Sequence, residues 1–338
     1  MSFLQIENSG SLKVITLSRP EALNSLNSSM IDGIAAALDE AENDPAIMAV
    51  LFKGAGGKAF CAGGDIKAAR EGTIAAKSGL IRLEKVTDFF VREYDLNKRL
   101  FHYSKPTISF MNGITMGGGV GIANACSYKI ATDKTIWAMP EVTIGFFPDV
   151  GAGYYLGKCP DFAGRYLGLT GAHLSNAGDL IQCGLADFLI SSTEEDRLIA
   201  ELSHRGDIKD CLKNLHSGTG KGELNYADIR DCFAKDSVEA ILKNLENKNS
   251  EWAKATAKLL LSKSPTSLKV TLQHLIKAES EEFDEIIARD LHLAGRFLAG
   301  HDMSEGIRAA VVDKDRNPQW FPKTLSEVGI ETVSDYIN

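Results

Sequence analysis

Glycine is concentrated in two short segments, and each segment follows an apolar run that is typical of a buried strand. Ten of the 31 glycines fall within residues 54–64 and 113–121. The apolar runs before them are residues 46–54 and 107–112. Because glycine has no Cβ, its backbone can come closer to a neighbour than that of any other residue. Each cluster therefore predicts either a backbone N–H that faces a ligand or a tight turn at a close helix crossing, and a lone glycine motif does not decide between them.

Strand-like and helix-like periods alternate around these clusters up to about residue 190. Hydrophobic periodicity predicts strands over 11–18, 46–54, 107–112 and 128–133, and helices over 27–43 and 79–101. This alternation indicates an α/β fold. From about residue 194 the chain becomes charged and helical, and Ser264-Pro265-Thr266 has the form of a helix start. We therefore expect a core over 1–193 and a helical region over 194–338 that packs on it.

Composition excludes several classes of protein. Hydrophobic residues make up 44% of the chain, which is ample for a core. The 37 Lys and Arg against 45 Asp and Glu give a net charge of -8, so a nucleic-acid partner is not expected. No apolar stretch approaches about 20 residues, so no membrane partner is expected either. The first ten residues lack the features of a signal or transit peptide, which favours a cytoplasmic protein, or a mitochondrial matrix protein without its presequence. The six cysteines form no CxxC pair and predict buried free thiols.

Two carboxylates stand in an apolar segment with little charge, MPEVTIGFFPDVG. Glu141 and Asp149 are eight residues apart, and each follows a proline. A carboxyl in apolar surroundings has a raised pKa and can serve as an acid, a base or a nucleophile. A helix cap or a salt-bridged loop residue would also explain either one. Metal-ligand spacings of His and Cys are missing, as are complete nucleotide-binding glycine motifs, so we expect no metal and no resident cofactor.

Three motifs in this order resemble the crotonase superfamily, also called the enoyl-CoA hydratase/isomerase family. They are KAFCAGGDI (58–66), NGITMGGGVGI (112–122) and MPEVTIGFFPDVGAGYYL (139–156). Together with EGIRAAVVDKDRNPQWFP (305–322), they extend the resemblance over nearly the whole chain, with the greater similarity to the acyl-CoA hydrolases of the superfamily. The resemblance implies a spiral of strand-strand-helix units followed by helices that pack back on it.

The resemblance also implies roles for individual residues. The backbone N–H groups of Gly64 and Gly118 would hold the oxygen of a thioester. Glu141 would be the catalytic carboxylate, and Asp149 would be its partner near a substrate hydroxyl group. Glu93 matches a substrate-contacting glutamate of the hydrolases.

Coenzyme A would lie by the loop of Ala62, Gly63 and Asp65, as part of the substrate and not as a cofactor. Hydratases of the superfamily carry a second catalytic glutamate where this chain has Gly121, and the hydrolases lack it. The implied reaction is hydrolysis of a short 3-hydroxyacyl-CoA, such as 3-hydroxyisobutyryl-CoA in valine breakdown. The alternatives are hydration or isomerisation of another acyl-CoA, and a non-catalytic, ribosome-associated scaffold. A homo-oligomer is compatible with each of these.

Overall fold

The structure is a computed structural model that describes residues 3–204, 206–218 and 220–338. Contacts between residues divide it into two compact units, and each unit collects separate stretches of the chain. Unit 1 takes its described residues from 1–64, 95–138 and 174–224, and unit 2 takes them from 65–94, 139–173 and 225–338. The units are interleaved along the sequence, and the boundary expected near residue 194 stays a prediction.

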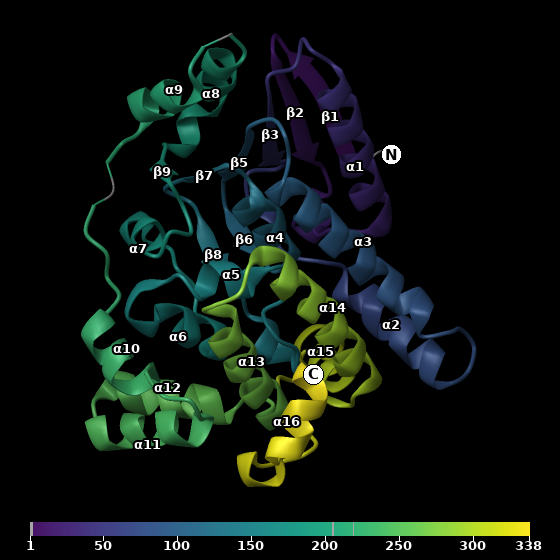
Figure 1. The fold of residues 1–338 in the computed structure, drawn as a ribbon, viewed down its shortest axis with the longest axis vertical. Helices are drawn as coiled ribbons and strands as arrows, with labels where there is room; N and C mark the ends of the chain where they lie inside the picture. Colours follow the sequence, from purple (N-terminus) through teal and green to yellow (C-terminus); the bar gives the residue numbers. More distant parts are fainter. Residues whose placement is uncertain (1–2, 205, 219) are drawn as a thin grey trace. The chain divides into compact units, whose positions relative to one another are not determined.

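Unit 1 is built on two β-sheets (Figure 1). The larger sheet has six strands, of which the first pair is antiparallel and the others are parallel. In spatial order they are β1 (Leu4–Ser9), β2 (Leu12–Leu17), β3 (Ala49–Gly54), β5 (Thr107–Met111), β7 (Tyr128–Ala131) and β9 (Phe188–Leu189). The smaller sheet is parallel and contains β4 (Ala59–Cys61), β6 (Ile114–Met116) and β8 (Ile136–Ala138).

Successive strand pairs are shared between the two sheets in a repeating way. In each of the pairs β3–β4, β5–β6 and β7–β8, the first strand joins the six-stranded sheet and the second joins the three-stranded sheet. Each repeat therefore advances both sheets by one position, as a spiral of strand-strand-helix units requires. The expected fold class, α/β with a C-terminal helical region, is confirmed.

Five α-helices lie wholly within the described residues of unit 1, and two of them extend its hydrophobic core. The helices are α1 (Ser28–Asn43), α4 (Gly118–Ala125), α7 (Ala177–Gln182), α8 (Glu195–Leu202) and α9 (Ile208–Leu215). Leu198 on α8 and Leu212 on α9 are fully buried in the same cluster as Leu51 and Phe110 of the large sheet. Their removal from water stabilises the folded chain by about 1.5–3 kcal/mol for each side chain.

Unit 2 is mainly helical. Its helices are α2 (Ile66–Lys77), α5 (Ala152–Leu156), α6 (Ala163–Thr170), α10 (Tyr226–Phe233), α11 (Val238–Lys248), α12 (Glu251–Leu261), α13 (Pro265–Ala278), α14 (Phe283–Ala299), α15 (Asp302–Ile307) and α16 (Ile330–Ile337). Helix α3 (Glu84–Phe101) contributes its residues up to 94 to unit 2 and the later ones to unit 1. Helix α13 starts as predicted, because Ser264 caps it and Pro265 occupies its first turn.

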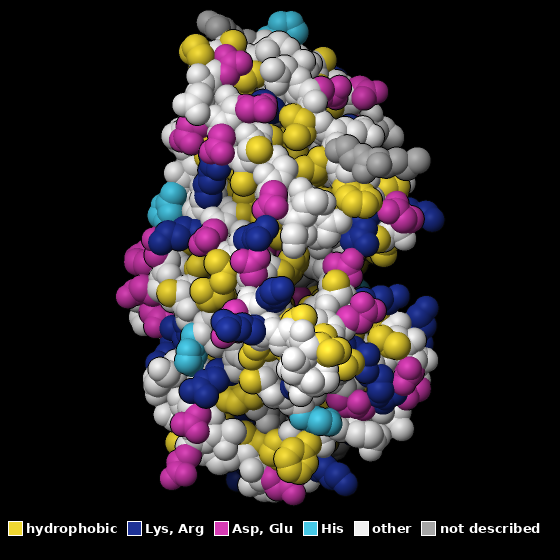
Figure 2. Space-filling view, turned by 90° about the vertical axis from the view of Figure 1, so that its right-hand side faces the viewer, with side chains coloured by type: hydrophobic (Ala, Val, Ile, Leu, Met, Phe, Trp, Pro, Cys, Tyr) yellow, Lys and Arg dark blue, Asp and Glu magenta, His cyan; other side chains and the backbone are white. Residues whose placement is uncertain are grey.

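The predicted cysteine state is confirmed: all six cysteines are thiols outside any disulfide, five are buried, and Cys211 is partly buried. Figure 2 shows acidic and basic side chains interspersed on the face in view. Within the described ranges, no helix is long and apolar enough to cross a membrane.

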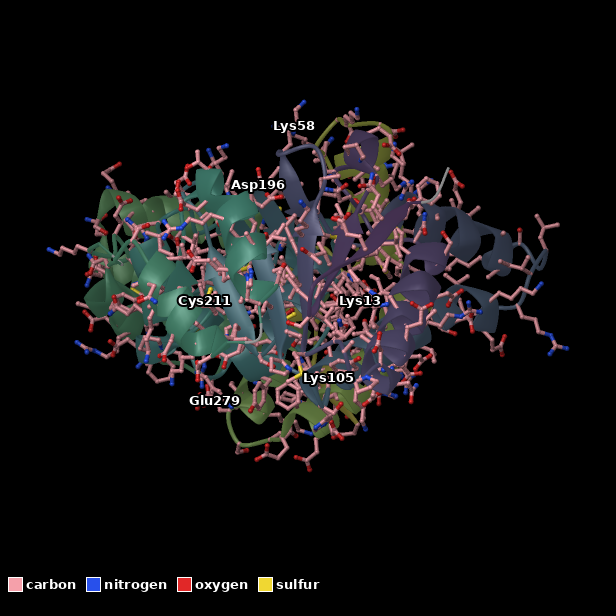
Figure 3. All side chains as sticks on the ribbon, turned by 90° about the horizontal axis from the view of Figure 1, so that it is seen from above. Lys13, Lys58, Lys105, Asp196, Cys211 and Glu279 are labelled. Carbon is pink, nitrogen blue, oxygen red and sulfur yellow. The ribbon has the colours of Figure 1, made fainter. Side chains whose placement is uncertain are left out.

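A partly buried lysine of unit 1 has a structural role. Lys105, labelled in Figure 3, donates hydrogen bonds to the carbonyl oxygens of Ala41, Asp44 and Ile47, at 2.5, 2.8 and 2.8 Å. These oxygens lie at and just beyond the C-terminal end of α1, where carbonyl groups lack partners within the helix and a positive charge is favourable. Lys105 therefore fixes the turn between α1 and β3.

Candidate active site

The first glycine cluster forms the loop after β4 in unit 1. The Ala62 N–H donates to the carbonyl of Leu23 at 3.0 Å, and the Gly63 carbonyl accepts from the N–H of Leu26 at 2.8 Å. Gly63 has a φ of 109°, which a side chain would strain, and Gly64 forms a parallel bridge with Leu26. The loop is thus held through its own backbone at the end of the strand.

The second cluster begins α4, directly after β6. Gly117, with a φ of 51°, precedes the helix, so the N–H of Gly118 belongs to its first turn, where N–H groups have no acceptor within the helix. A Cβ on Gly63 would lie 3.8 Å from the Gly118 nitrogen, and one on Gly119 would lie 2.2 Å from the Cys61 carbonyl oxygen. Only glycine permits this approach, and the two loops are therefore neighbours within unit 1.

The structure brings together the three carboxyls that the sequence singles out, all in unit 2. Glu93 lies on α3, Glu141 opens the single turn η2 (Glu141–Ile144), and Asp149 lies three residues before α5. They are 3%, 8% and 5% exposed. Within the part of the chain that the structure describes, none of them pairs with a cation, and one oxygen each of Glu93 and Glu141 has no hydrogen-bond partner.

Tyr94 completes this cluster. Its hydroxyl donates to Oδ2 of Asp149 at 2.6 Å, and its side chain is buried. Tyr94 could not be identified from the sequence, because its partner is 55 positions away along the chain and its own neighbourhood shows only a helical period. The one feature of the sequence that could have pointed to Tyr94 is its position directly after Glu93.

Burial and mutual repulsion keep these carboxyls from ionising at their usual pH. Burial, with the charge of Asp149 as a second cause, raises the pKa values of Glu93 and Glu141 well above the ordinary value. Burial also raises the pKa of Asp149 to about 7, against the lowering effect of the Tyr94 hydrogen bond. The three groups together therefore carry less than their full negative charge at neutral pH, as acid–base chemistry near pH 7 requires.

Aromatic rings pack on one another and on Tyr94, beside the buried carboxyls. The ring centroid of Phe90 lies 5.9 Å from those of both Tyr94 and Phe146, and Phe297 packs 5.5 Å from Phe146 and from Phe147. Phe146 and Phe147 come from the segment between Glu141 and Asp149. Phe146 thus packs on Phe90, which packs in turn on Tyr94, the hydrogen-bond partner of Asp149.

The residues expected to contact coenzyme A do not all belong to one unit. Ala62 and Gly63 belong to unit 1, whereas Asp65 belongs to unit 2 and caps α2 by accepting from the Ala68 N–H at 3.3 Å. Helix capping alone accounts for an aspartate at this position. Over residues 3–204, 206–218 and 220–338, no group of three or more His, Cys, Asp or Glu side chains is arranged to hold a metal ion.

The spiral of strand pairs, with glycine loops at strand ends and buried carboxyls, defines a protein of the crotonase class. A model of the enoyl-CoA hydratase/isomerase family matches residues 12–337, and the chain belongs to this family. It is 38% identical to the mitochondrial 3-hydroxyisobutyryl-CoA hydrolase of Rattus norvegicus, over 98% of this chain and 87% of the rat protein. The identity with the Homo sapiens protein of the same name is 37%, with the same coverage.

A solved structure extends the similarity to the whole fold. The carnitinyl-CoA dehydratase of Mycobacterium thermoresistibile superimposes with a TM-score of 0.92 at 33% identity, over 100% of this chain and 97% of that one. Its name describes a reaction different from that of the rat and human relatives. The fold is therefore common to several acyl-CoA reactions, and the choice among them depends on the side chains of the site.

Proposed function

We propose that this protein hydrolyses a short 3-hydroxyacyl-CoA thioester, with 3-hydroxyisobutyryl-CoA as its first candidate, to give free coenzyme A and 3-hydroxyisobutyrate. The observation that carries the proposal is the cluster of buried carboxyls Glu93, Glu141 and Asp149, which has no cation beside it in the described chain. The names of the rat and human relatives support the same reaction.

The position of Gly121 supports hydrolysis over hydration. It lies buried within α4, where hydratases of the family carry their second glutamate. Addition of water across a double bond by two carboxylates would require that second glutamate, and this chain has glycine in its place.

In the proposed reaction the N–H groups of Gly64 and Gly118 donate to the thioester oxygen as it gains negative charge. Such donors act only as the charge develops, and the loss of one typically costs about 3 kcal/mol of transition-state stabilisation. Ala62, Gly63 and Asp65 would contact the coenzyme A part of the substrate. These roles follow from the family resemblance.

Glu141 can act in one of two ways, as a nucleophile or as a general base. Its carboxylate attacks the carbonyl carbon, the C–S bond breaks, coenzyme A leaves as a thiolate that takes up a proton, and water then hydrolyses the mixed anhydride. Alternatively, it removes a proton from a water molecule that attacks the same carbon. Hydroxylamine distinguishes the two, because it traps an anhydride on Glu141 as a hydroxamate.

Asp149 and Glu93 would hold the acyl part of the substrate. An ionised Asp149, already bonded to Tyr94 through Oδ2, can accept a hydrogen bond from a substrate 3-hydroxyl group. Glu93, with an unpartnered buried oxygen, would make a second contact. This pairing predicts a preference for 3-hydroxyacyl groups.

The proposal includes an acyl-CoA as the partner, no resident cofactor, and no nucleic-acid or membrane partner. It allows a homo-oligomer, and it places the protein in a bacterial cytoplasm or a mitochondrial matrix. The rat and human relatives carry the word mitochondrial in their names.

The test is thiol release from 3-hydroxyisobutyryl-CoA by the wild type and by Glu141→Gln, with crotonyl-CoA as the competing substrate. We expect thiol release by the wild type, a loss of about 100-fold or more in the variant, and little hydration of crotonyl-CoA. Full activity of Glu141→Gln would remove Glu141 from the central role. A wild type that hydrates crotonyl-CoA and releases no thiol would support the hydratase alternative, and one inert toward both substrates would support the scaffold alternative.

A further inference from the structure

The turn that carries Asp149 has an unusual backbone. Val150 has a φ of 56°, and Gly151 follows with a φ of 76°. A β-branched residue rarely adopts the left-handed region, which costs about 1–2 kcal/mol for residues other than glycine. Such a conformation persists only where the surrounding structure fixes it.

A buried carboxyl on a distant helix fixes this turn. Asp290, on α14, is fully buried, and its Oδ2 accepts the N–H of Gly151 at 2.7 Å. A Cβ on Gly151 would lie 2.4 Å from the ring of Phe283, so the turn is also confined from the other side. Asp149 is two residues before this hydrogen bond and belongs to the same unit.

The second oxygen of Asp290, Oδ1, lies close to a buried histidine but forms no hydrogen bond with it. Arg289 donates from Nε to Nδ1 of the buried His274 at 3.0 Å, so His274 carries its own proton on Nε2. That nitrogen is 3.2 Å from Oδ1 of Asp290. Burial and the charge of Arg289 lower the pKa of His274 to about 3, which keeps the ring neutral. Arg289 in turn pairs with Glu281 at 2.5 Å.

We propose that Asp290 is a positioning residue: by accepting the Gly151 N–H, it holds the turn in the one conformation that directs the Asp149 carboxyl at the 3-hydroxyl group of the substrate. This inference rests on the proposed function, since it requires Asp149 to contact that hydroxyl group. Burial of the polar side chains of Asp290 and His274 lowers the stability of the fold, and this inference gives the pair a function.

Asp290→Asn is the decisive variant, because Oδ2 of this carboxyl accepts the Gly151 N–H and Oδ1 lies 3.2 Å from Nε2 of His274. An amide offers one acceptor oxygen, so either Gly151 or His274 would face its NH₂ group. Asp290→Ala removes both acceptors. Asp302→Asn is the matched control: Asp302 is buried in the same unit and accepts from the Phe321 N–H at 2.8 Å and from Ser264 at 2.5 Å, away from this turn.

The readout is selectivity, measured as kcat/KM for 3-hydroxyisobutyryl-CoA divided by kcat/KM for isobutyryl-CoA, which lacks the hydroxyl group. Asp149→Asn should lower this ratio about 10-fold or more, since it removes a charged hydrogen-bond acceptor. Asp290→Asn should lower it about 3- to 10-fold and Asp290→Ala further, while Asp302→Asn should leave it within 2-fold. A merely structural role would lower both kcat/KM values together and leave their ratio unchanged.

The outcomes separate this inference from the proposed function. If the wild type is selective and Asp149→Asn loses selectivity, but Asp290→Asn keeps the wild-type ratio, the inference on Asp290 is overturned and the hydrolase proposal stands. The same conclusion follows if the double variant Asp149→Asn/Asp290→Asn shows additive losses, because a residue acting through Asp149 must lose its effect when Asp149 is changed. If the wild type releases no thiol at all, the proposed function fails and the inference fails with it. Should Asp290→Ala not fold, the ratio of Asp290→Asn decides alone.

Discussion

Replacement of Asp149 by asparagine should make the protein more stable at alkaline pH. Asparagine has the same shape, and its carbonyl oxygen can still accept the hydrogen bond from Tyr94, which is 2.6 Å long in the wild type. The change removes a buried ionisable carboxyl and, with it, the repulsion that helps to raise the pKa values of Glu93 and Glu141. The energetic consequence of burying this charge is the largest part of the expected difference.

The magnitude follows from the raised pKa of Asp149. The folded carboxyl keeps its proton up to a pKa of about 7, whereas in the unfolded chain it releases the proton near 3.8. Between these pH values the folded state binds more protons, so raising the pH lowers the free energy of unfolding, by about 1.4 kcal/mol for each pH unit. Asparagine does not titrate. The stability gain of the variant over the wild type should thus grow by about 3 kcal/mol between pH 5 and pH 8.

Urea unfolding of both proteins at pH 5 and pH 8, followed by circular dichroism, measures this difference. We expect the two midpoints to lie closer together at pH 5 and the variant to be clearly more resistant at pH 8. The same variant should be impaired in catalysis, so stability and activity would change in opposite directions. A gain that is equal at both pH values, or a loss that is larger at pH 8, would refute the reasoning.

Three further substitutions test other parts of the structure. Tyr94→Phe removes the hydroxyl that lowers the pKa of Asp149, so the rise of kcat/KM with pH should shift to higher pH; an unchanged pH–rate profile would contradict this. Gly119→Ala places a Cβ 2.2 Å from the carbonyl oxygen that ends β4 and should destabilise the chain by about 1–3 kcal/mol in urea unfolding, whereas Gly295→Ala, in open space on α14, should be neutral or stabilising. Lys105→Met leaves three carbonyl oxygens without their cation and should lower stability by about 3 kcal/mol in the same assay; a change below about 0.5 kcal/mol would contradict its structural role.

Long periodic elements could be predicted from the sequence, and very short ones could not. The helix predicted over 27–43 is α1, and the strand predicted over 46–54 contains β3, because each has a clear period and a buried face. The strands β4, β6 and β8 have three residues each, too few to show alternation, and β4 and β6 lie beside the two glycine clusters. The second sheet was therefore not expected from periodicity.

Other differences have local causes. The helix predicted to start at residue 79 begins at Glu84, after a segment in which Gly79 has a φ of 76° and Leu80 is largely exposed. Strand β1 was missed because most of its residues are exposed, so it lacks an apolar face.

The candidate site was predictable only in part, and for a physical reason. Glu141 and Asp149 stand out because their segment is apolar, and Glu93 was identified through the family resemblance. Tyr94 and Asp290 act through partners 55 and 139 positions away, and such pairings leave no local pattern in a single sequence. The sequence thus indicates candidates for the chemistry, which remain predictions, whereas the side chains that contact these candidates could be identified only in the structure.

The interleaving of the two units limits how this chain can be cut. The chain passes from one unit to the other after residues 64, 94, 138, 173 and 224, so no single cleavage yields one unit intact. A fragment that ends at residue 193 would lose α8 and α9, and the apolar side chains of unit 1 that these helices cover would become exposed. From unit 2 the fragment would keep the segments that carry the carboxyls, but it would lack α13 and α14. Nicking at one site should therefore release no stable half-molecule, and complementation between separately expressed fragments should require both halves to fold together.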